Sequence, residues 1–227
     1  MITYKGRQVP ETFEEILNPA HTALIIHEMR NDLRETGTHD KDGKPIIIDM
    51  STIAGPISKL IEAARRNKMK IIYAGYVGHS DESLYSDYMI QKSYKRLTDP
   101  KTAPPGLDAT QKSRAFQVID ELKPQPGDTM LMKPRVDCFI GTDLELMLRW
   151  GGIKTIVIAG VGSEIGIVPT VFHAINLGFF VVVPSDGVRP THTDWHEDAL
   201  KFISHNCHGN VAEVRPSSDI LKVWKKK

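Results

Sequence analysis

The most regular feature of the chain is a series of short apolar segments, each separated from the next by a polar or amphipathic stretch. The segments are rich in branched side chains and do not alternate between apolar and polar residues. This is the pattern of strands that are buried on both faces of a sheet. It predicts strands at residues 22–27, 69–74, 129–133, 155–160, 179–183 and 211–214.

Helical periodicity appears between these strands. It is clearest between residues 53 and 64, where five apolar side chains share one helical face: Ile53, Ile57, Leu60, Ile61 and Ala64. Apolar stretches with helix start or stop signals predict further helices at 84–95, 115–122, 142–150, 165–177 and 194–207, and a last one from Ser217 onward. Residues 34–49 are polar and predict a loop.

Strands that alternate with helices, each strand continuously apolar, predict a mainly parallel sheet covered by helices on both faces. The expected fold class is therefore α/β, with three layers in the order α/β/α around a central sheet. The sequence contains no internal repeat, low-complexity segment or linker. We expect residues 1–227 to form a single domain.

Composition narrows the possible functions. The 227 residues include 29 Lys and Arg against 28 Asp and Glu, a net charge of +1, so no electrostatic footprint predicts a nucleic acid or a membrane surface as partner. Two cysteines cannot form a disulfide framework, which favours a reducing compartment. The N-terminal residues lack the apolar run of a signal peptide, and no stretch has the length of a membrane span. We expect a cytoplasmic protein.

Ligands in such folds bind beyond the carboxyl ends of the strands, which directs attention to three segments. Glu28 follows the first strand; it would be a partly desolvated acid or base, or it would cap the next segment. Lys133 ends the third strand, next to Arg135; it would stabilise an oxyanion or pair with a carboxylate, or it would extend to solvent. Gly162 and Gly166 lie in the turn after residues 155–160, where backbone N–H groups at a helix start can bind an anion. This turn has neither the spacing of a dinucleotide loop nor the lysine of a P-loop.

These segments resemble three motifs of the isochorismatase-like hydrolase family, which belongs to the cysteine hydrolase superfamily. Residues 133–144 resemble the family's lysine segment, which runs through a Phe to a Gly-Thr-Asp-Leu helix start. Residues 158–186 resemble its nucleophile segment and the strand beyond. Residues 23–33 resemble its opening strand, where an acidic residue precedes Met-Gln-Asn-Asp-Phe. The resemblance covers about residues 22–214, with the three motifs in the family's order.

Members of this family use an Asp–Lys–Cys triad for amide hydrolysis. The resemblance implies that Lys133 is the lysine, that Glu28 stands in the place of the aspartate and that Gly166 stands in the place of the cysteine. The isochorismatases proper also carry a glycine at the nucleophile position and a His-Asp-Met start to the first motif, and they cleave a vinyl ether without a covalent step. His27-Glu28-Met29 is similar to that start, although the glutamate departs from both branches.

The resemblance therefore implies a hydrolase that acts on a small molecule by a non-covalent acid/base mechanism, cleaving a vinyl ether or another C–N or C–O bond. Glu28, protonated, would donate a proton, and Lys133 would hold an anionic group or stabilise negative charge. Arg135 and the N–H groups of Gly162 and Gly166 would bind the substrate. The alternative is a catalytically inactive family member that serves as a small-ligand-binding or assembly subunit.

We expect neither a cofactor nor a metal. His192 and His196 have helical spacing, but no glutamate lies between them to complete a zinc motif. Where some relatives bind a metal, after the second strand, this chain has His79 alone. Cys138 and Cys207 are expected to be packing residues. Because relatives are commonly dimers or tetramers, the resemblance also implies a homo-oligomer.

Overall fold

The computed structural model of the protein describes residues 1–35, 38–39, 45–76, 86–98, 114–204 and 212–225. Its centre is a sheet in which the strands follow the order β11-β9-β8-β3-β6-β7, with β10 paired to β8. All of these pairs are parallel. The strands are β3 (Thr22–His27), β6 (Lys70–Tyr76), β7 (Thr129–Lys133), β8 (Thr155–Val161), β9 (Phe180–Pro184), β10 (Val188–Arg189) and β11 (Glu213–Arg215).

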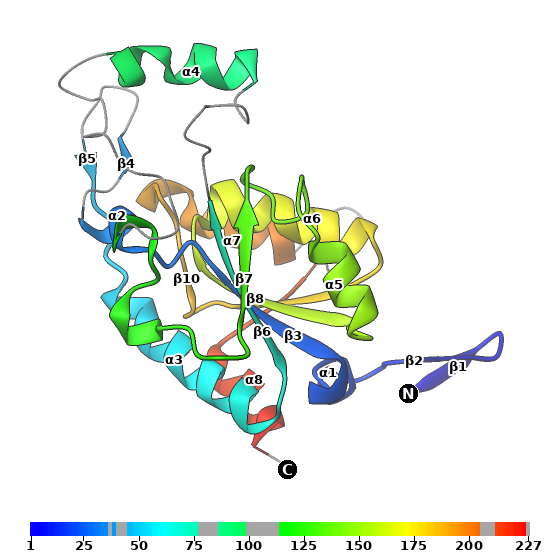
Figure 1. Ribbon diagram of the computed structural model, residues 1–227. Helices are drawn as coiled ribbons and strands as arrows, with labels where there is room; N and C mark the ends of the chain where they lie inside the picture. Colours follow the sequence, from blue (N-terminus) through cyan, green and yellow to red (C-terminus); the bar gives the residue numbers. More distant parts are fainter. Residues whose placement is uncertain (36–37, 40–44, 77–85, 99–113, 205–211, 226–227) are drawn as a thin grey trace.

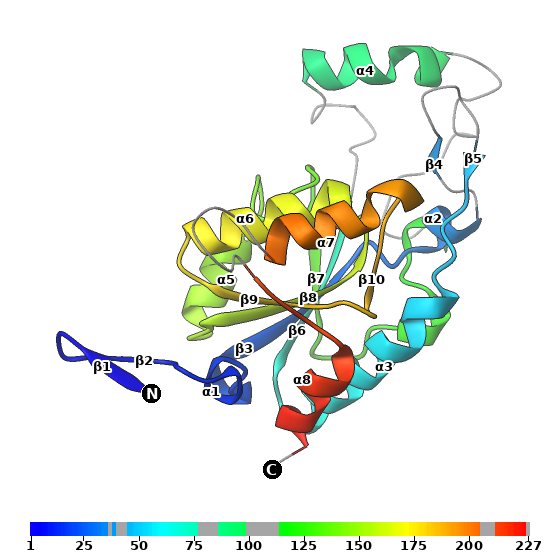
Figure 2. The same cartoon turned by 180° about the vertical axis from the view of Figure 1, so that it is seen from behind.

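Helices cover both faces of this sheet (Figures 1 and 2). One face is covered by α3 (Ser51–Arg66) and α8 (Ser217–Trp224), and the other by α5 (Leu144–Trp150), α6 (Val168–Asn176) and α7 (His196–Ser204). The buried apolar residues accordingly form two clusters, one on each face. The predicted three-layer α/β/α fold with a mainly parallel sheet is confirmed.

The remaining elements lie around this body. They are α1 (Phe13–Ile16), α2 (Asn31–Glu35), α4 (Asp87–Thr98), the antiparallel hairpin of β1 (Ile2–Tyr4) and β2 (Arg7–Val9), and the short pair β4 (Thr38–His39) and β5 (Pro45–Ile46). The N-terminal hairpin and α4 stand away from the sheet in both views (Figures 1 and 2). The hairpin was not predicted, because its residues are almost all exposed and carry no burial pattern.

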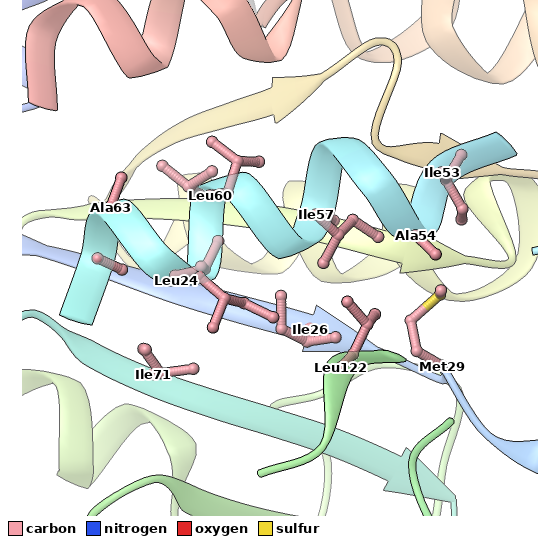
Figure 3. Packing of buried hydrophobic residues seen from close by; sticks show 14 of the residues in the cluster. Leu24, Ile26, Met29, Ile53, Ala54, Ile57, Leu60, Ala63, Ile71 and Leu122 are labelled. Carbon is pink, nitrogen blue, oxygen red and sulfur yellow. The ribbon is translucent and has the colours of Figure 1, made fainter. Parts of the chain in front are cut away.

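The strands and α3 meet as the sequence pattern predicts. Leu24 and Ile26 alternate with residues of the other face along β3 and contact the helix, where Ile57 and Leu60 are fully buried (Figure 3). The helix begins at Ser51, just before the first periodic residue. The carbonyl of its N-cap residue, Met50, accepts a hydrogen bond from the Ala54 N–H. This packing fixes the position of β3, which Glu28 directly follows.

The predicted helix at 115–122 is wrong. The structure has two single 3₁₀ turns there, Arg114–Phe116 and Asp120–Leu122. Between them the backbone is extended: Val118 forms an antiparallel bridge with Arg30, and the Ile119 N–H donates to the Met29 carbonyl. Bonds to the neighbouring segment replace those of a helix. The predicted helix at 165–177 also begins differently, as a π-helical turn (Ser163–Ile167) that leads into α6.

The core packing gives a first prediction. Leu60→Ala should lower the free energy of unfolding by about 2–5 kcal/mol, because a fully buried leucine loses its transfer energy and leaves a cavity. Leu146→Ala on α5 is the control; Leu146 is 69% exposed, and its loss should change stability by less than about 0.5 kcal/mol. Urea unfolding measures both. Equal losses in the two variants would contradict the packing described for α3.

Candidate active site

The strand order places the candidate site at a defined point of the sheet. Numbered along the chain, the six main strands lie in the order 3-2-1-4-5-6, so the connections change direction between β3 and β8. Crevices that bind ligands form at such switch points, outside the carboxyl ends of the strands. His27 at the end of β3 pairs with Gly160 of β8. The segments that follow the two strands therefore leave the sheet side by side.

Glu28 leaves β3 in a left-handed backbone conformation, with φ of 53°. This conformation is uncommon for a residue other than glycine, and such strain is concentrated at functional sites. Two hydrogen bonds hold the turn: the Glu28 N–H donates to the Ala74 carbonyl, and the Glu28 carbonyl accepts from the Arg30 N–H, each at 2.9 Å. The turn directs the carboxylate across β6 toward β7.

The carboxylate of Glu28 meets two cations there. Its Oε1 lies 2.7 Å from Lys133 Nζ and accepts a second bond from the Tyr76 N–H at 2.7 Å. Its Oε2 lies 3.2 Å from Arg30 Nε, but no described group donates a well-aligned hydrogen bond to it. Glu28, Lys133 and Arg30 are all buried. The structure thus brings together the predicted pair Glu28 and Lys133 and leaves Oε2 without a well-aligned hydrogen bond.

The balance of charge decides the protonation state of Glu28. Burial raises its pKa, but the charges of Arg30 and Lys133 and the hydrogen bond from Lys133 outweigh burial and lower the pKa to about 2. The carboxyl group is ionised at neutral pH. The protonated form expected from the sequence is therefore not the resting form, because two cations surround the group rather than one.

Lys133 acts as a fixed charge in this arrangement. Its three ammonium hydrogens have three acceptors: Glu28 Oε1 at 2.7 Å, the Arg135 carbonyl at 3.1 Å and the Val136 carbonyl at 3.3 Å. The alternative that Lys133 extends to solvent is wrong, since the side chain is only 2% exposed. The Arg135 guanidinium is partly exposed and bonds, among the described residues, only to the Pro134 carbonyl.

The two glycines predicted to bind substrate have their N–H groups engaged. The Gly162 N–H donates to the Arg189 carbonyl, and the Gly166 N–H donates to the Gly162 carbonyl, each at 2.8 Å. Neither group is free to polarise a substrate in this backbone arrangement. Their role in binding stays a prediction.

His27 is a site residue to which the sequence analysis gave no role. Its Nδ1 lies 2.7 Å from the Val161 carbonyl, so Nδ1 carries the proton and Nε2 the lone pair. Burial lowers the pKa of His27 to about 4, and the charge of Lys133 acts in the same direction, so the ring is neutral. Nε2 is buried and makes no well-aligned hydrogen bond among the described residues, although the Val136 backbone lies close enough to act on the pKa of the ring. The sequence signal that could have identified His27 as a site residue is its position as a polar residue at the end of an otherwise apolar strand.

Arg30 is a second such residue. Its Nη2 donates to Asp32 at 2.8 Å, and its guanidinium lies over the Phe116 ring at 4.9 Å. It also lines a cavity of about 470 Å³ on the α3 side of β6 and β7, a volume typical of small-ligand sites. Glu28 and Lys133 do not line this cavity. Arg30 therefore lies between the cavity and the ion pair.

The other candidates have simpler explanations. Cys138 is buried, and burial raises the pKa of its thiol to about 12, as expected for a packing residue. In the part of the chain that the structure describes, no group of three or more His, Cys, Asp or Glu could hold a metal ion. His79 and Cys207 lie outside the described residues. Ser163 is buried, and its Oγ lies 3.1 Å from His196 Nδ1.

Comparison with known proteins identifies the family. The isochorismatase domain family matches residues 22–215, most of the chain. This chain belongs to that family. The resemblance seen in the three sequence motifs is thereby confirmed, and the matched region starts at β3 and ends at β11, the span of the sheet.

Individual isochorismatase-family relatives agree with this assignment. Ureidoacrylate amidohydrolase RutB of Rhizobium rhizogenes is 27% identical over 219 residues, which cover 94% of this chain and 87% of that protein. RutB of an Enterobacter species is 28% identical over 227 residues, which cover 97% of this chain and 96% of that protein. The chain is a hydrolase, as the sequence predicted.

Solved structures of the family support the fold. A cysteine hydrolase from Pseudomonas syringae pv. phaseolicola superposes with a TM-score of 0.75 at 21% identity, over 92% of this chain and 94% of the other. N-carbamoylsarcosine amidase from Thermoplasma acidophilum gives 0.64 at 24% identity, over 87% and 96%. Within the described ranges, no helix of this isochorismatase-family chain is both long and apolar enough to cross a bilayer. The cytoplasmic location and the homo-oligomer remain predictions.

The buried histidine predicts a pH dependence of stability. Because the pKa of His27 falls from 6.5 to about 4 on folding, the unfolded chain binds a proton between these values that the folded chain does not. Stability should therefore fall as the pH drops from 6.5 to 4, by on the order of 2–3 kcal/mol from this group. His27→Gln, which cannot titrate but can still donate to the Val161 carbonyl, should flatten the curve in that window.

Urea unfolding at several pH values between 7 and 4 measures the difference between the two proteins. Burial also lowers the pKa of His196, but that residue is present in both proteins and its contribution cancels. Parallel curves for wild type and variant would show that the His27 ring is not held neutral by the fold.

Proposed function

We propose that the chain hydrolyses a small molecule by a non-covalent acid/base mechanism in which Glu28 and Lys133 act at the carboxyl edge of the sheet. The observation that supports this most directly is the buried ion pair, with 2.7 Å between Glu28 Oε1 and Lys133 Nζ, at the switch point where Gly166 provides no side chain. Without a thiol or hydroxyl at that position, the attacking group must be water.

The ionised carboxylate sets the order of proton transfers. Glu28 Oε2, which accepts no well-aligned hydrogen bond from the described residues, takes a proton from the water as the water oxygen attacks the electrophilic carbon. The C–N or C–O bond then breaks, and the leaving group takes the same proton from Glu28, which returns to its carboxylate form. This order suits acyl and ureido substrates. A vinyl ether would need an acid at the first step, whereas the charges of Arg30 and Lys133 lower the pKa of Glu28 and keep it ionised.

The two basic residues differ in their proposed roles. Lys133, with its three donors engaged, keeps Glu28 oriented and lowers the cost of its charge. Arg135 would bind an anionic group of the substrate, because its guanidinium is partly exposed and has no carboxylate partner among the described residues. The similar proteins named ureidoacrylate amidohydrolase act on a small acid with a ureido group. We therefore propose small carboxylates that carry a ureido or amide group as the first substrates to test.

Glu28→Gln tests the mechanism. The amide fills the same space but cannot accept and return a proton, so turnover should fall by roughly 10²–10⁴-fold. Glu145→Gln is the matched control, since it changes an exposed glutamate that pairs with Arg149 on α5, and it should leave turnover unchanged. Glu28→Asp, which carries the family's residue, should keep measurable turnover. Assays use a panel of ureido acids, amides and vinyl ethers.

Three outcomes of that assay are informative. Full activity of Glu28→Gln on a confirmed substrate would remove the acid/base role and leave Glu28 as a structural group. Activity on vinyl ethers alone would reverse the proposed order of proton transfers. Binding without turnover across the panel would favour the alternative, a ligand-binding or assembly subunit.

Thiol modification tests the absence of a covalent step. Iodoacetamide should leave turnover unchanged under native conditions, because Gly166 cannot react and the buried thiol of Cys138 has a raised pKa. The labelled positions are identified by peptide mass. Loss of activity in proportion to the labelling of one cysteine would show that a thiol takes part in the reaction.

A further inference from the structure

We infer that His27 determines the class of chemistry at this site, because its imidazole fills the volume at residue 166 from which a covalent nucleophile would act. The inference deepens the proposed function and rests on it. It makes His27 and Gly166 a matched pair, in which a side chain at 166 requires a smaller residue at 27.

The backbone does not explain the glycine at 166. Gly162, four residues earlier, has φ of 82°, a conformation that favours glycine whatever its surroundings. Gly166 lies outside the left-handed region, inside the helical turn Ser163–Ile167, where any L-residue fits the backbone. The reason for glycine at 166 must therefore be steric.

The obstacle is the His27 ring. A Cβ atom built on Gly166 would lie 2.2 Å from His27 Cε1 and 2.7 Å from His27 Nε2, well inside contact distance. The ring cannot easily move away, because it is buried and its Nδ1 is bonded to the Val161 carbonyl at 2.7 Å. A side chain at 166 and an imidazole at 27 exclude each other.

The position of the ring relates this exclusion to the chemistry. His27 directly precedes Glu28, whose Oε1 lies 2.7 Å from Lys133 Nζ. The volume that the ring occupies thus adjoins the ion pair. A thiol at residue 166 would take the place of the ring, whereas the present ring offers a neutral nitrogen and no nucleophile. The imidazole therefore excludes a nucleophilic side chain at residue 166, and water is left as the nucleophile that attacks the substrate.

A double-mutant cycle tests the pair. Gly166→Ala alone should lower the melting temperature by roughly 5–10 °C, the shift expected for overpacking in a chain of this length. In a His27→Ala or His27→Val background, the same substitution should cost less than about 2 °C or raise the melting temperature, since it enters the vacated space. Gly55→Ala on α3, where a Cβ meets nothing within 4 Å, is the control and should behave alike in all backgrounds.

A second measurement tests the chemical half. In the double variant His27→Val/Gly166→Cys, the introduced thiol should react with iodoacetamide at neutral pH at least about tenfold faster than Cys138 in the same molecule, because a nucleophile at residue 166 must reach a small molecule in the site, whereas burial keeps the Cys138 thiol protonated. Peptide mass gives both rates, and neither measurement needs a substrate.

Two results would overturn the inference. An equal cost of Gly166→Ala in all backgrounds would overturn the steric pair. Labelling of the introduced thiol no faster than that of Cys138 would overturn the link between residue 166 and the nucleophile position. Because both measurements are made without substrate, their failure stays separate from any failure to find turnover.

Discussion

Glu28 carries a negative charge in a buried position, and the arrangement of the site follows from the need to compensate that charge. An unpaired ion in a protein interior costs several kcal/mol even after relaxation. Lys133 approaches from β7, Arg30 from the turn after β3, and the Tyr76 N–H from the end of β6. Removal of the Glu28 carboxylate would leave Lys133 buried without a counter-charge among the described residues, at a cost of about 3–5 kcal/mol. The ion pair thus binds the carboxyl ends of three neighbouring strands to one another.

The same network links charge to backbone conformation. The left-handed turn at Glu28 is held because its N–H and carbonyl groups are both bonded, and the turn in turn brings the carboxylate to the cations. Gly160 lies so close to His27 across the β3–β8 pair that a Cβ would meet the His27 carbonyl oxygen at 2.0 Å. The two strands at the switch point can therefore approach closely, and the residues after them form one site although about 130 residues separate them in the chain.

Much of this could be predicted from the sequence, and the exceptions have a common cause. Continuous apolar runs identify β3, β6 and β8 because burial on both faces is a local property of the sequence. The positions of Glu28, Lys133 and Gly166 follow from the family motifs. The segment around Val118 did not form the expected helix because its backbone bonds to Met29 and Arg30. The ionised state of Glu28 depends on Arg30, and the glycine at 166 depends on His27. Each of these three features depends on a contact between particular groups. The spacing of apolar residues within one segment gives no information about such contacts.

The packing at residue 166 also bears on whether the site has simply lost a nucleophile. Removal of a side chain from a packed interior leaves a cavity, and cavities are costly. Here the space is filled by a ring that is fixed to the Val161 carbonyl. An apolar side chain at position 27 would fill the same space. It would also avoid the cost of a buried nitrogen without a well-aligned hydrogen-bond partner, which is about 1–3 kcal/mol. Packing alone therefore does not account for an imidazole. The chemistry of the site accounts for it: the neutral ring adds an acceptor nitrogen beside the Glu28–Lys133 pair, and it excludes a covalent nucleophile at residue 166.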